Sequence, residues 1–343
     1  MHMAPNRRSA GQLDMPIFLL IGFGGGLASA VLFSSAAAGG VAGRLVLYIL
    51  VPLPCFLAGL GWGSTAAGVA AGVGAASVGV VLGSKSALLF FLSQGLPAAV
   101  LCHLALLSRP QVAGPAGQVS SSGTPSLEWY PPGRLTAVAT LLAGILAALS
   151  LLVLGPDLDA LRTLLRELIE NVFLKELPGL MDRQLSPDDI AAITEFSLYA
   201  LPAASAMLWL GGTLLNFWLA GRITLLSGRL QRPWPDLAAM TYPRGFALGL
   251  AAALALSFLS GYPALIGSGF GGAFFLAYVL MGLAIVHYLT RGRASRPFVL
   301  WGMYFALLVL NTWAAILIAL LALLEPFLPF NRRAARPPAS PPD

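Results

Sequence analysis

The stretch PIFLLIGFGGGLASAVLFSS, residues Pro16–Ser35, decides the fold class, because it runs for twenty positions without a charged residue. About 20 apolar residues in a helix cross a ~30 Å hydrocarbon core, since each residue advances the helix by ~1.5 Å. The run exceeds the apolar core of about 7–15 residues in a signal peptide, and more apolar runs follow it at once. We therefore interpret it as an uncleaved first membrane span.

The composition of the whole chain extends this interpretation. Of its 343 residues, 57% are hydrophobic and 10% are charged, whereas soluble domains carry about 25% charged residues. So few charges cannot cover a surface that faces water, which means that the outer surface must face lipid. A membrane β-barrel would show short segments of alternating polarity, but these runs are continuous. The prediction is an all-α, polytopic transmembrane helix bundle embedded in the lipid bilayer.

The apolar runs predict about nine spans (eight or nine). They lie at about 16–36, 44–62, 64–84, 86–107, 134–155, 196–226, 244–263, 267–290 and 297–324. Pro52 and Pro54 fall inside the second run, so we expect a kink or an unwound turn there. Gly267–Gly272 (GSGFGG) is interpreted as a tight turn that opens the eighth span.

The segments between the runs divide the chain into units. We predict a cytoplasmic tail at 1–15, a first four-helix membrane unit at 16–107, a flexible loop at 108–133, a fifth span at 134–155, an acidic amphipathic helical loop at 156–195, a C-terminal four-helix membrane unit at 196–324 and a disordered tail at 325–343. In the acidic loop, Leu158, Leu161 and Leu165 share one helical face, which favours a helix that lies on the membrane or caps the bundle. Ser186–Asp189 is typical of a helix start that continues into the sixth span.

Topology follows from the Lys and Arg residues, which concentrate on the cytoplasmic side of a membrane protein. With the N-terminus inside, eleven of them fall on the inner side and nine on the outer side. This predicts a multi-pass protein of the cytoplasmic (inner) membrane. Nine spans, however, would place Arg332, Arg333 and Arg336 outside. Either a span is miscounted, with the kinked second span as one candidate, or the tail crosses despite its charges.

Small residues recur four positions apart in the first span, at Gly22, Gly26, Ala30 and Ser34. Small side chains let helix backbones approach closely in lipid. The ladder therefore predicts either packing within this chain or a docking face for another membrane subunit. The third span is small on nearly every side, so we expect it at the centre of the bundle.

Uncharged polar and aromatic residues inside the apolar runs are the candidates for a ligand pocket. They are Gln94, Asn216, Trp218, Asn311 and Trp313. These amides either bond other helices or line a pocket for a small, partly apolar ligand. No span carries Asp or Glu near its middle, which argues against a proton pump built on a buried carboxylate relay.

Enzyme and metal signatures are missing from the sequence. There is no HExxH motif, no nucleophile elbow and no phosphate-binding loop. Cys55 and Cys102 lie inside apolar runs without metal-ligand spacing and are interpreted as buried hydrophobic residues. The basic residues sit between spans, which disfavours nucleic-acid binding. We predict a protein without catalytic residues, bound metal or cofactor.

Three segments carry a resemblance: the Gly-rich first span, VPLPCFLAGLGWG at Val51–Gly63, and ALPAASAMLWLGGTLLNFWLAGRI at Ala200–Ile223. Over roughly residues 16–320 the chain resembles the YybS-like family of bacterial membrane proteins. That family is similar to the Gx-transporter group, which includes the S subunits of energy-coupling-factor transporters. The resemblance implies docking of a coupling partner through Gly22, Gly26, Ala30 and Ser34.

Two functions remain open. The first is a solute-binding or transport-associated subunit that acts with other membrane proteins. The alternative is a membrane scaffold for cell-envelope or morphogenesis machinery, bound through the acidic loop.

Overall fold

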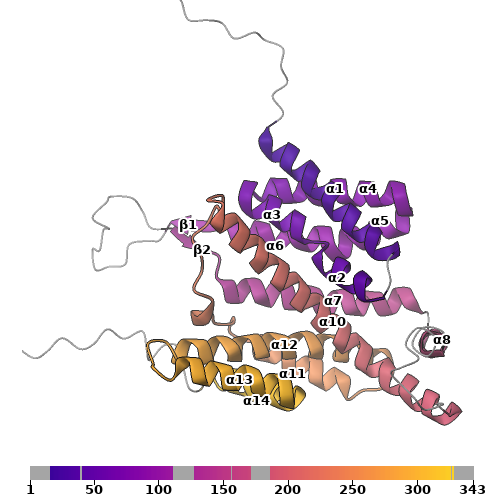
Figure 1. The fold of residues 1–343 in the computed structure, drawn as a ribbon. Coiled ribbons are helices and arrows are strands. Elements are labelled where there is room, and N and C mark those ends of the chain that lie inside the picture. Colours follow the sequence, from indigo (N-terminus) through magenta and orange to yellow (C-terminus); the bar gives the residue numbers. More distant parts are fainter. Residues whose placement is uncertain are drawn as a thin grey trace, which may run out of the picture. The chain divides into compact units, whose positions relative to one another are not determined.

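The computed structural model describes residues 16–38, 41–110, 127–155, 157–170, 186–325 and 327. The predicted tail at 1–15, most of the loop at 108–133 and nearly all of the tail after 325 therefore lie outside the described residues. The elements in chain order are α1 (Ile17–Ala38), α2 (Val41–Leu50), α3 (Leu53–Trp62), α4 (Ser64–Leu82), α5 (Ser84–Phe90), the π-helical turn η1 (Phe91–Gly95), α6 (Leu96–Leu106), β1 (Ser108–Pro110), β2 (Leu127–Trp129), α7 (Pro132–Leu154), α8 (Leu158–Leu168), α10 (Pro187–Leu226), the 3-10 turn η3 (Leu237–Ala239), α11 (Phe246–Ser257), α12 (Tyr262–Leu289), α13 (Arg296–Leu310) and α14 (Thr312–Leu323) (Figure 1). The predicted all-α class is confirmed, and a short antiparallel pairing of β1 with β2 is the one sheet in the described part of the chain.

Seven of the described helical segments are long and apolar enough to cross a membrane. They are 17–36, 43–62, 64–82, 84–106, 132–154, 187–226 and 262–289. Two predicted spans are not among them. The run 244–263 holds only the 12-residue α11, and the run 297–324 is divided into α13 and α14. The predicted count of eight or nine is therefore not reached by this measure.

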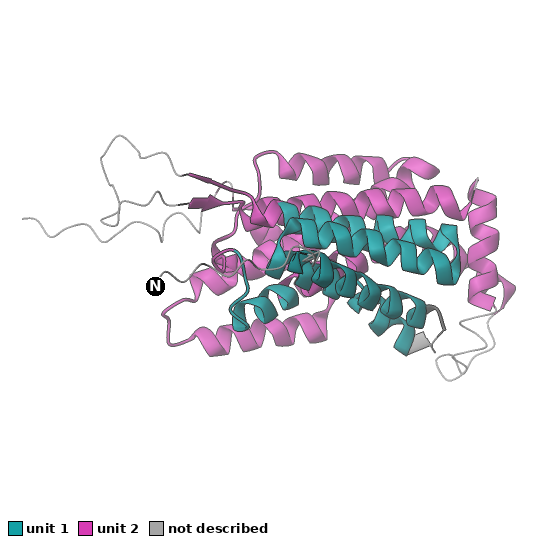
Figure 2. Cartoon of the chain, turned by 90° about the horizontal axis from the view of Figure 1, so that it is seen from above, with its two compact units in different colours: residues 1–103, 219–231 teal, residues 104–218, 232–343 magenta. Residues whose placement is uncertain are grey.

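The chain forms two compact units (Figure 2). Unit 1 contains residues 1–103 and 219–231, and unit 2 contains residues 104–218 and 232–343. The first division falls close to the predicted end of the first membrane unit at 107. The end of α10 belongs with unit 1, which the sequence did not indicate.

Glycine contacts hold unit 1 together. A Cβ at Gly26 would lie 2.6 Å from the carbonyl oxygen of Ala70 and 2.9 Å from the amide nitrogen of Gly74, so α1 touches the backbone of α4. At the level of Pro52 the chain breaks between α2 and α3, as the sequence predicted. Only one face of α4 is buried, because Gly68 and Gly72 are exposed, so the expectation of a helix enclosed on all sides is wrong.

The outer surfaces of the helices are apolar. Phe23 and Val31 of α1 expose more than half of their surface, and Val153 of α7 is 85% exposed. In a protein surrounded by water such a surface would cost roughly 25 cal/mol per Å². The exposed apolar side chains therefore indicate lipid contact.

In unit 2, α12 is the element against which α7, α11 and α14 pack. A Cβ at Gly272 would meet the backbone of Ala203 in α10, and one at Gly267 would meet the backbone of α11. The predicted turn at Gly267–Gly272 is wrong, because α12 already begins at Tyr262 and these glycines lie within it. They serve close helix packing, and small residues do this as readily inside a helix as before one.

The two ends of α12 differ in charge. Its first residue, Tyr262, donates a hydrogen bond from its hydroxyl to the carbonyl oxygen of Gly155, 2.7 Å away, beside the acidic α8 segment. Its last residue is followed by Arg291, Arg293 and Arg296. We call these the acidic end and the arginine end of α12.

α13 and α14 form a hairpin on α12 (Figure 1). α13 begins at the arginine end and rises by about 22 Å over its 15 residues. If α14 continued in the same direction, Ile318 would lie about 33 Å from that end, near Tyr262. Ile318 instead contacts Gly282, which is only about 10 Å from the arginine end of α12. The chain therefore reverses at Asn311, and the prediction of one span at 297–324 is wrong.

Candidate functional site

The segment formed by residues 236–257 is α-helical over only part of its length. Asp236 is tied to Arg291 at the arginine end, whereas α11 begins at Phe246 after Gly245, whose φ is +86°. Between them the Tyr242 hydroxyl donates a hydrogen bond to the carbonyl oxygen of Ala277, 2.6 Å away. Ala277 lies in the middle of α12, about 18 Å from the arginine end, so the Tyr242 side chain reaches that level. We call residues 236–245, which contain the single 3-10 turn η3 and no α-helix, the non-helical stretch.

Aromatic rings gather where α11 starts. The ring of Phe246 lies 4.4 Å from that of Tyr242, 4.8 Å from that of Phe274 and 5.6 Å from that of Tyr278, between centroids. Phe274 and Tyr278 are almost fully buried. Such rings offer apolar faces together with two hydroxyl groups, and the start of α11 adds the partial positive charge of a helix N-terminus.

The reversal at Asn311 lies at a similar level of α12. Asn311 has φ of +44° and ψ of −108°, the one positive φ of a non-glycine residue in the described chain. α13 has no buried residue, and its Tyr304 hydroxyl lies 2.9 Å from Nε2 of His287 in α12. Two chain segments of unit 2 are thus interrupted near the middle of α12.

The sequence-predicted pocket residues differ in burial and in the unit to which they belong. Asn216 is fully buried, and its Nδ2 donates to the carbonyl oxygen of Gly212 at 2.6 Å. Trp218, two residues along α10 and therefore on a different face, is 43% exposed. Asn311 and Trp313 are both exposed at the hairpin tip. Gln94 is buried in η1 of unit 1, whereas the other four belong to unit 2.

The predicted docking ladder faces α4. A Cβ at Gly22 would lie 2.8 Å from the carbonyl oxygen of Ala66, and Gly26 meets Ala70 and Gly74 as described above. Ala30 is buried and Ser34 is half-buried. Packing within the chain, the alternative that the sequence left open, is what occupies this face at both glycines.

A shallow groove of about 560 Å³ lies between α4 and α5 of unit 1. It is lined by Ala75, Ala76, Gly79, Val80, Ser84, Ala87, Leu88 and Phe91. This lining has no residue in common with the predicted pocket. Its openness to the outside and apolar walls fit a lipid-facing depression better than a binding site for a polar solute.

Arg232, in the segment after α10, contacts the end of α6 and the residues at the end of β2. Its guanidinium donates to the carbonyl oxygen of Ala105 at 2.9 Å and to that of Tyr130 at 3.4 Å, and it lies 5.9 Å from the ring centre of Trp129. Ala105 stands in the last turn of α6, where carbonyl groups lack helical partners. Partial burial lowers the pKa of Arg232, yet these contacts stabilise its charge. Arg232 is therefore a structural clamp.

Asp236 and Arg291 form a two-pronged ion pair nearby. Arg291 Nη1 donates to one carboxylate oxygen at 2.6 Å, and Nη2 donates to the other. The guanidinium holds the pKa of Asp236 below its ordinary value of 3.8. The pair fixes the start of the non-helical stretch to the end of α12.

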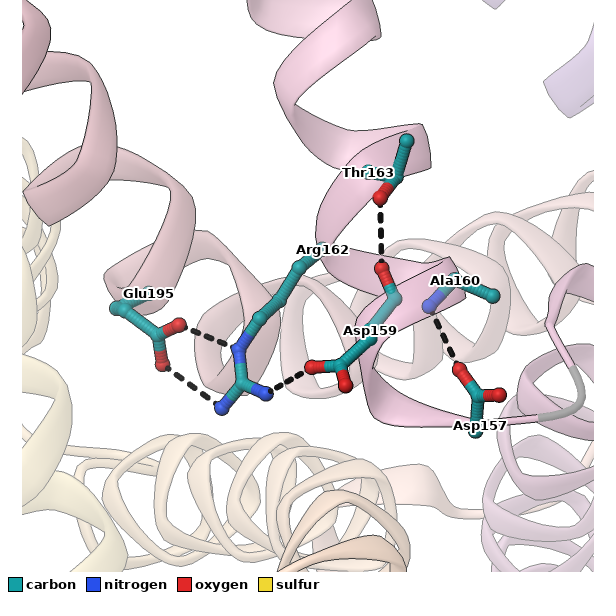
Figure 3. Close-up of polar contacts among 6 residues, drawn as sticks. All are labelled: Asp157, Asp159, Ala160, Arg162, Thr163 and Glu195. Carbon is teal, nitrogen blue, oxygen red and sulfur yellow. Dashed lines mark hydrogen bonds and ion pairs between the residues drawn. The ribbon is translucent and has the colours of Figure 1, made fainter.

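The acidic end is closed by α8. Its Leu161 packs with Leu151, Leu198 and Leu265, so α8 caps the end of α7 and the start of α12 beside α10, one of the two predicted arrangements. On its other face Arg162 bonds Glu195 at 2.5 Å and Asp159 at 2.9 Å (Figure 3). These ion pairs raise the pKa of Arg162.

The predicted helix start at Ser186 is confirmed. The amide of Asp189 donates to the Ser186 hydroxyl at 3.1 Å, and the Asp189 carboxylate accepts from the Ser186 amide at 3.0 Å. From Pro187 the helix runs for 40 residues as α10, which includes the sixth predicted span.

Sequence reasoning missed Tyr242, Phe246 and Tyr278. The signal that was available is Pro243-Arg244-Gly245, which shortens the apolar run before α11. Among the described residues, no three His, Cys, Asp or Glu side chains lie together as a metal site would require. No family model, curated protein or solved structure matches the chain.

Proposed function

We propose that this chain is an integral membrane protein that binds and moves a small, partly apolar solute, with the solute path in unit 2 beside the middle of α12. The observation that carries the proposal is the interruption before α11, which starts only at Phe246, beside Phe274 in the middle of α12. An uninterrupted helix crosses lipid at a low free-energy cost, because its backbone N–H and C=O groups form hydrogen bonds with one another.

Non-helical backbone at membrane depth is tolerated only inside protein or along a water-filled cavity. Transporters use such broken helices near the middle of the membrane, where helix ends supply partial charges to the solute. The N-terminus of α11 and the cluster of Tyr242, Phe246, Phe274 and Tyr278 fit a solute with an apolar body and a polar group. The resemblance to the Gx-transporter group favours the same class of function.

Orientation follows from charge. The arginine end of α12 would face the cytoplasm of a bacterial cell, with the acidic end outside. Because α4 lies against Gly22 and Gly26, the proposal does not include partner docking through those two residues.

Water access tests the solute path. In a chain with Cys55 and Cys102 replaced by alanine, Thr241→Cys should react with a water-soluble thiosulfonate, because Thr241 lies in the non-helical stretch. Leu248→Cys is the matched control, since Leu248 is 74% exposed on α11 and should face lipid. Equal reactivity of the two cysteines, or silence at Thr241→Cys, would count against the path.

Ligand retention tests the solute. Native mass spectrometry of the purified chain should detect a co-purifying small molecule. Phe246→Ala should release it, whereas Phe258→Ala, at an exposed position after the same helix, should not. Failure to find any small molecule, together with an unreactive Thr241→Cys, would remove the proposal.

The scaffold alternative rests on α8. Asp159 exposes 90% of its side chain, and Glu167 is also exposed, so an acidic surface is available to a basic partner. Deleting α8 would remove Leu161 from the core, so the better test keeps the helix. If Asp159→Asn with Glu167→Gln abolishes the protein's function in the cell while solute retention is unchanged, the result favours the scaffold function over solute transport.

A further inference from the structure

The α13–α14 hairpin exposes a large, uncharged apolar surface. From Pro297 to Leu324 the chain contains no charged residue. Phe298 and Leu308 on α13 are both 81% exposed, and Trp313 on α14 is 74% exposed. Trp301 and Phe305 stack on the same helix with ring centroids 5.2 Å apart. An uncharged surface of this kind fits the acyl chains of a bilayer.

Each arm of the hairpin is too short to cross that bilayer. The 15 residues of α13 extend about 22 Å and the 12 residues of α14 about 18 Å, whereas a ~30 Å core needs ~20 helical residues. Because α14 runs back beside α12, both arms keep their open ends near the arginine end.

One arm is anchored and the other is peripheral. Because Gly282 has no side chain, the backbone of Ile318 in α14 packs directly against α12. Ala319 and Ala322 are buried in the same cluster as Met281 and Ile285. α13 lacks buried residues and meets α12 at the His287–Tyr304 contact. The hairpin is therefore held through α14, with α13 on its outer side.

Charge supplies an independent argument. Six arginines follow α12: Arg291, Arg293, Arg296, Arg332, Arg333 and Arg336. A single span at 297–324 would separate the first three from the last three by a membrane, against the positive-inside tendency. A hairpin leaves all six on one side, which removes the conflict that the sequence alone presented.

We propose that α13–α14 is a re-entrant hairpin, which enters the bilayer from the arginine end with acyl chains against its outer aromatic face and returns the C-terminal segment to the side of Arg291. The inference does not rest on the proposed function. It also means that the described chain does not cross the membrane between the end of α12 and the end of α14.

Cysteine labelling in sealed vesicles of the full-length chain tests this inference. In the variant with Cys55→Ala and Cys102→Ala, single cysteines are introduced as Ser260→Cys before α12, Ser295→Cys before α13, Thr312→Cys at the tip and Ser340→Cys in the tail. A membrane-impermeant maleimide is applied to vesicles of both orientations. Three of the four changes replace serine, and all three described positions are exposed, which protects folding.

The expected result has three parts. Ser295→Cys and Ser340→Cys label from the same side, Ser260→Cys labels from the opposite side, and Thr312→Cys reacts at least tenfold more slowly than Ser295→Cys. Labelling of Ser295→Cys and Ser340→Cys from opposite sides would overturn the inference, because α13 and α14 would then cross. Rapid labelling of Thr312→Cys from the side of Ser295→Cys would also overturn it, because the hairpin would lie outside the bilayer.

Discussion

Unit 1 and unit 2 solve the same physical problem, burial of helices in lipid, in different ways. Among the described residues unit 1 contains no Asp or Glu, and α1 touches the backbone of α4 through Gly22 and Gly26. Unit 2 holds every Asp and Glu that the structure describes, closes its acidic end with α8 and interrupts two segments beside α12. Both units use close glycine contacts, and unit 1 also has the break at Pro52, so the charged ends and the interruptions beside α12 are what distinguish unit 2.

The largest effect is expected from breaking the close packing of unit 1. Gly26→Leu places a side chain against backbone atoms of Ala70 and Gly74, which cannot move aside. Overpacking costs about 1–3 kcal/mol or more, so we expect loss of folded protein or a fall of at least ~3 kcal/mol in the free energy of unfolding. Fluorescence-detected size exclusion over a temperature series measures the change.

Gly24→Leu is the matched control for that change. Gly24 lies on the same helix, and nothing stands within 4 Å of a Cβ added there. The two variants should differ clearly, with Gly24→Leu close to the unchanged chain. Equal damage from both would contradict the account of how α1 packs.

A smaller effect is expected in unit 2 from Gly282→Val. The new side chain would meet the backbone of Ile318 in the anchored arm α14, but the hairpin can shift outward because α13 on its outer side has no buried residue. We expect about 1–3 kcal/mol of destabilisation, with faster proteolysis in the loops beside α13 and α14 as the diagnostic readout. Gly302→Val on α13 has open space around it and should leave proteolysis unchanged. A reversed order of the two variants would argue against the hairpin contact.

The smallest effect is expected from breaking the Asp236–Arg291 ion pair, which holds the start of the non-helical stretch at the end of α12. Arg291 lowers the pKa of Asp236 in the folded state, so the pair stabilises the fold above pH 3.8 and loses its contribution as the pH falls through the lowered value. Both side chains are more than 40% exposed, and such pairs are worth about 0–1 kcal/mol. Asp236→Asn should therefore lower the melting temperature slightly at pH 7, and the difference should vanish in acid. A constant difference down to pH 3 would show that the carboxylate charge is not responsible.

Local signals in the sequence were sufficient for several elements. Pro52 predicts the break between α2 and α3 because proline lacks a backbone N–H donor. Ser186 and Asp189 predict the start of α10 because these residue types cap each other's backbone N–H groups at the start of a helix. The apolar face of α8 is visible because its other face is charged. In each case the physical cause acts within one helical turn.

Other features depend on contacts that the sequence does not encode locally. The reversal at Asn311 lies inside an uncharged run of 28 residues, Pro297–Leu324, and the feature that reveals it is the distant contact of Ile318 with Gly282. Helices that are apolar on all sides give no rotational signal, so the sequence could not show that Asn216 is buried whereas Trp218 is 43% exposed. The glycines at 267–272 resemble a turn until a neighbouring helix is placed against them.

The reversal at Asn311 is the claim on which the account of unit 2 depends, and a distance measurement tests it most directly. Spin labels at Ser295→Cys and Glu325→Cys, in the chain without Cys55 and Cys102, are measured by pulsed electron paramagnetic resonance in lipid nanodiscs. A hairpin places the two ends of α13–α14 at the same end of α12, about 20 Å apart or less, whereas one continuous helix would separate them by about 45 Å. A single short distance is the predicted result, and a distribution centred near 45 Å would contradict it.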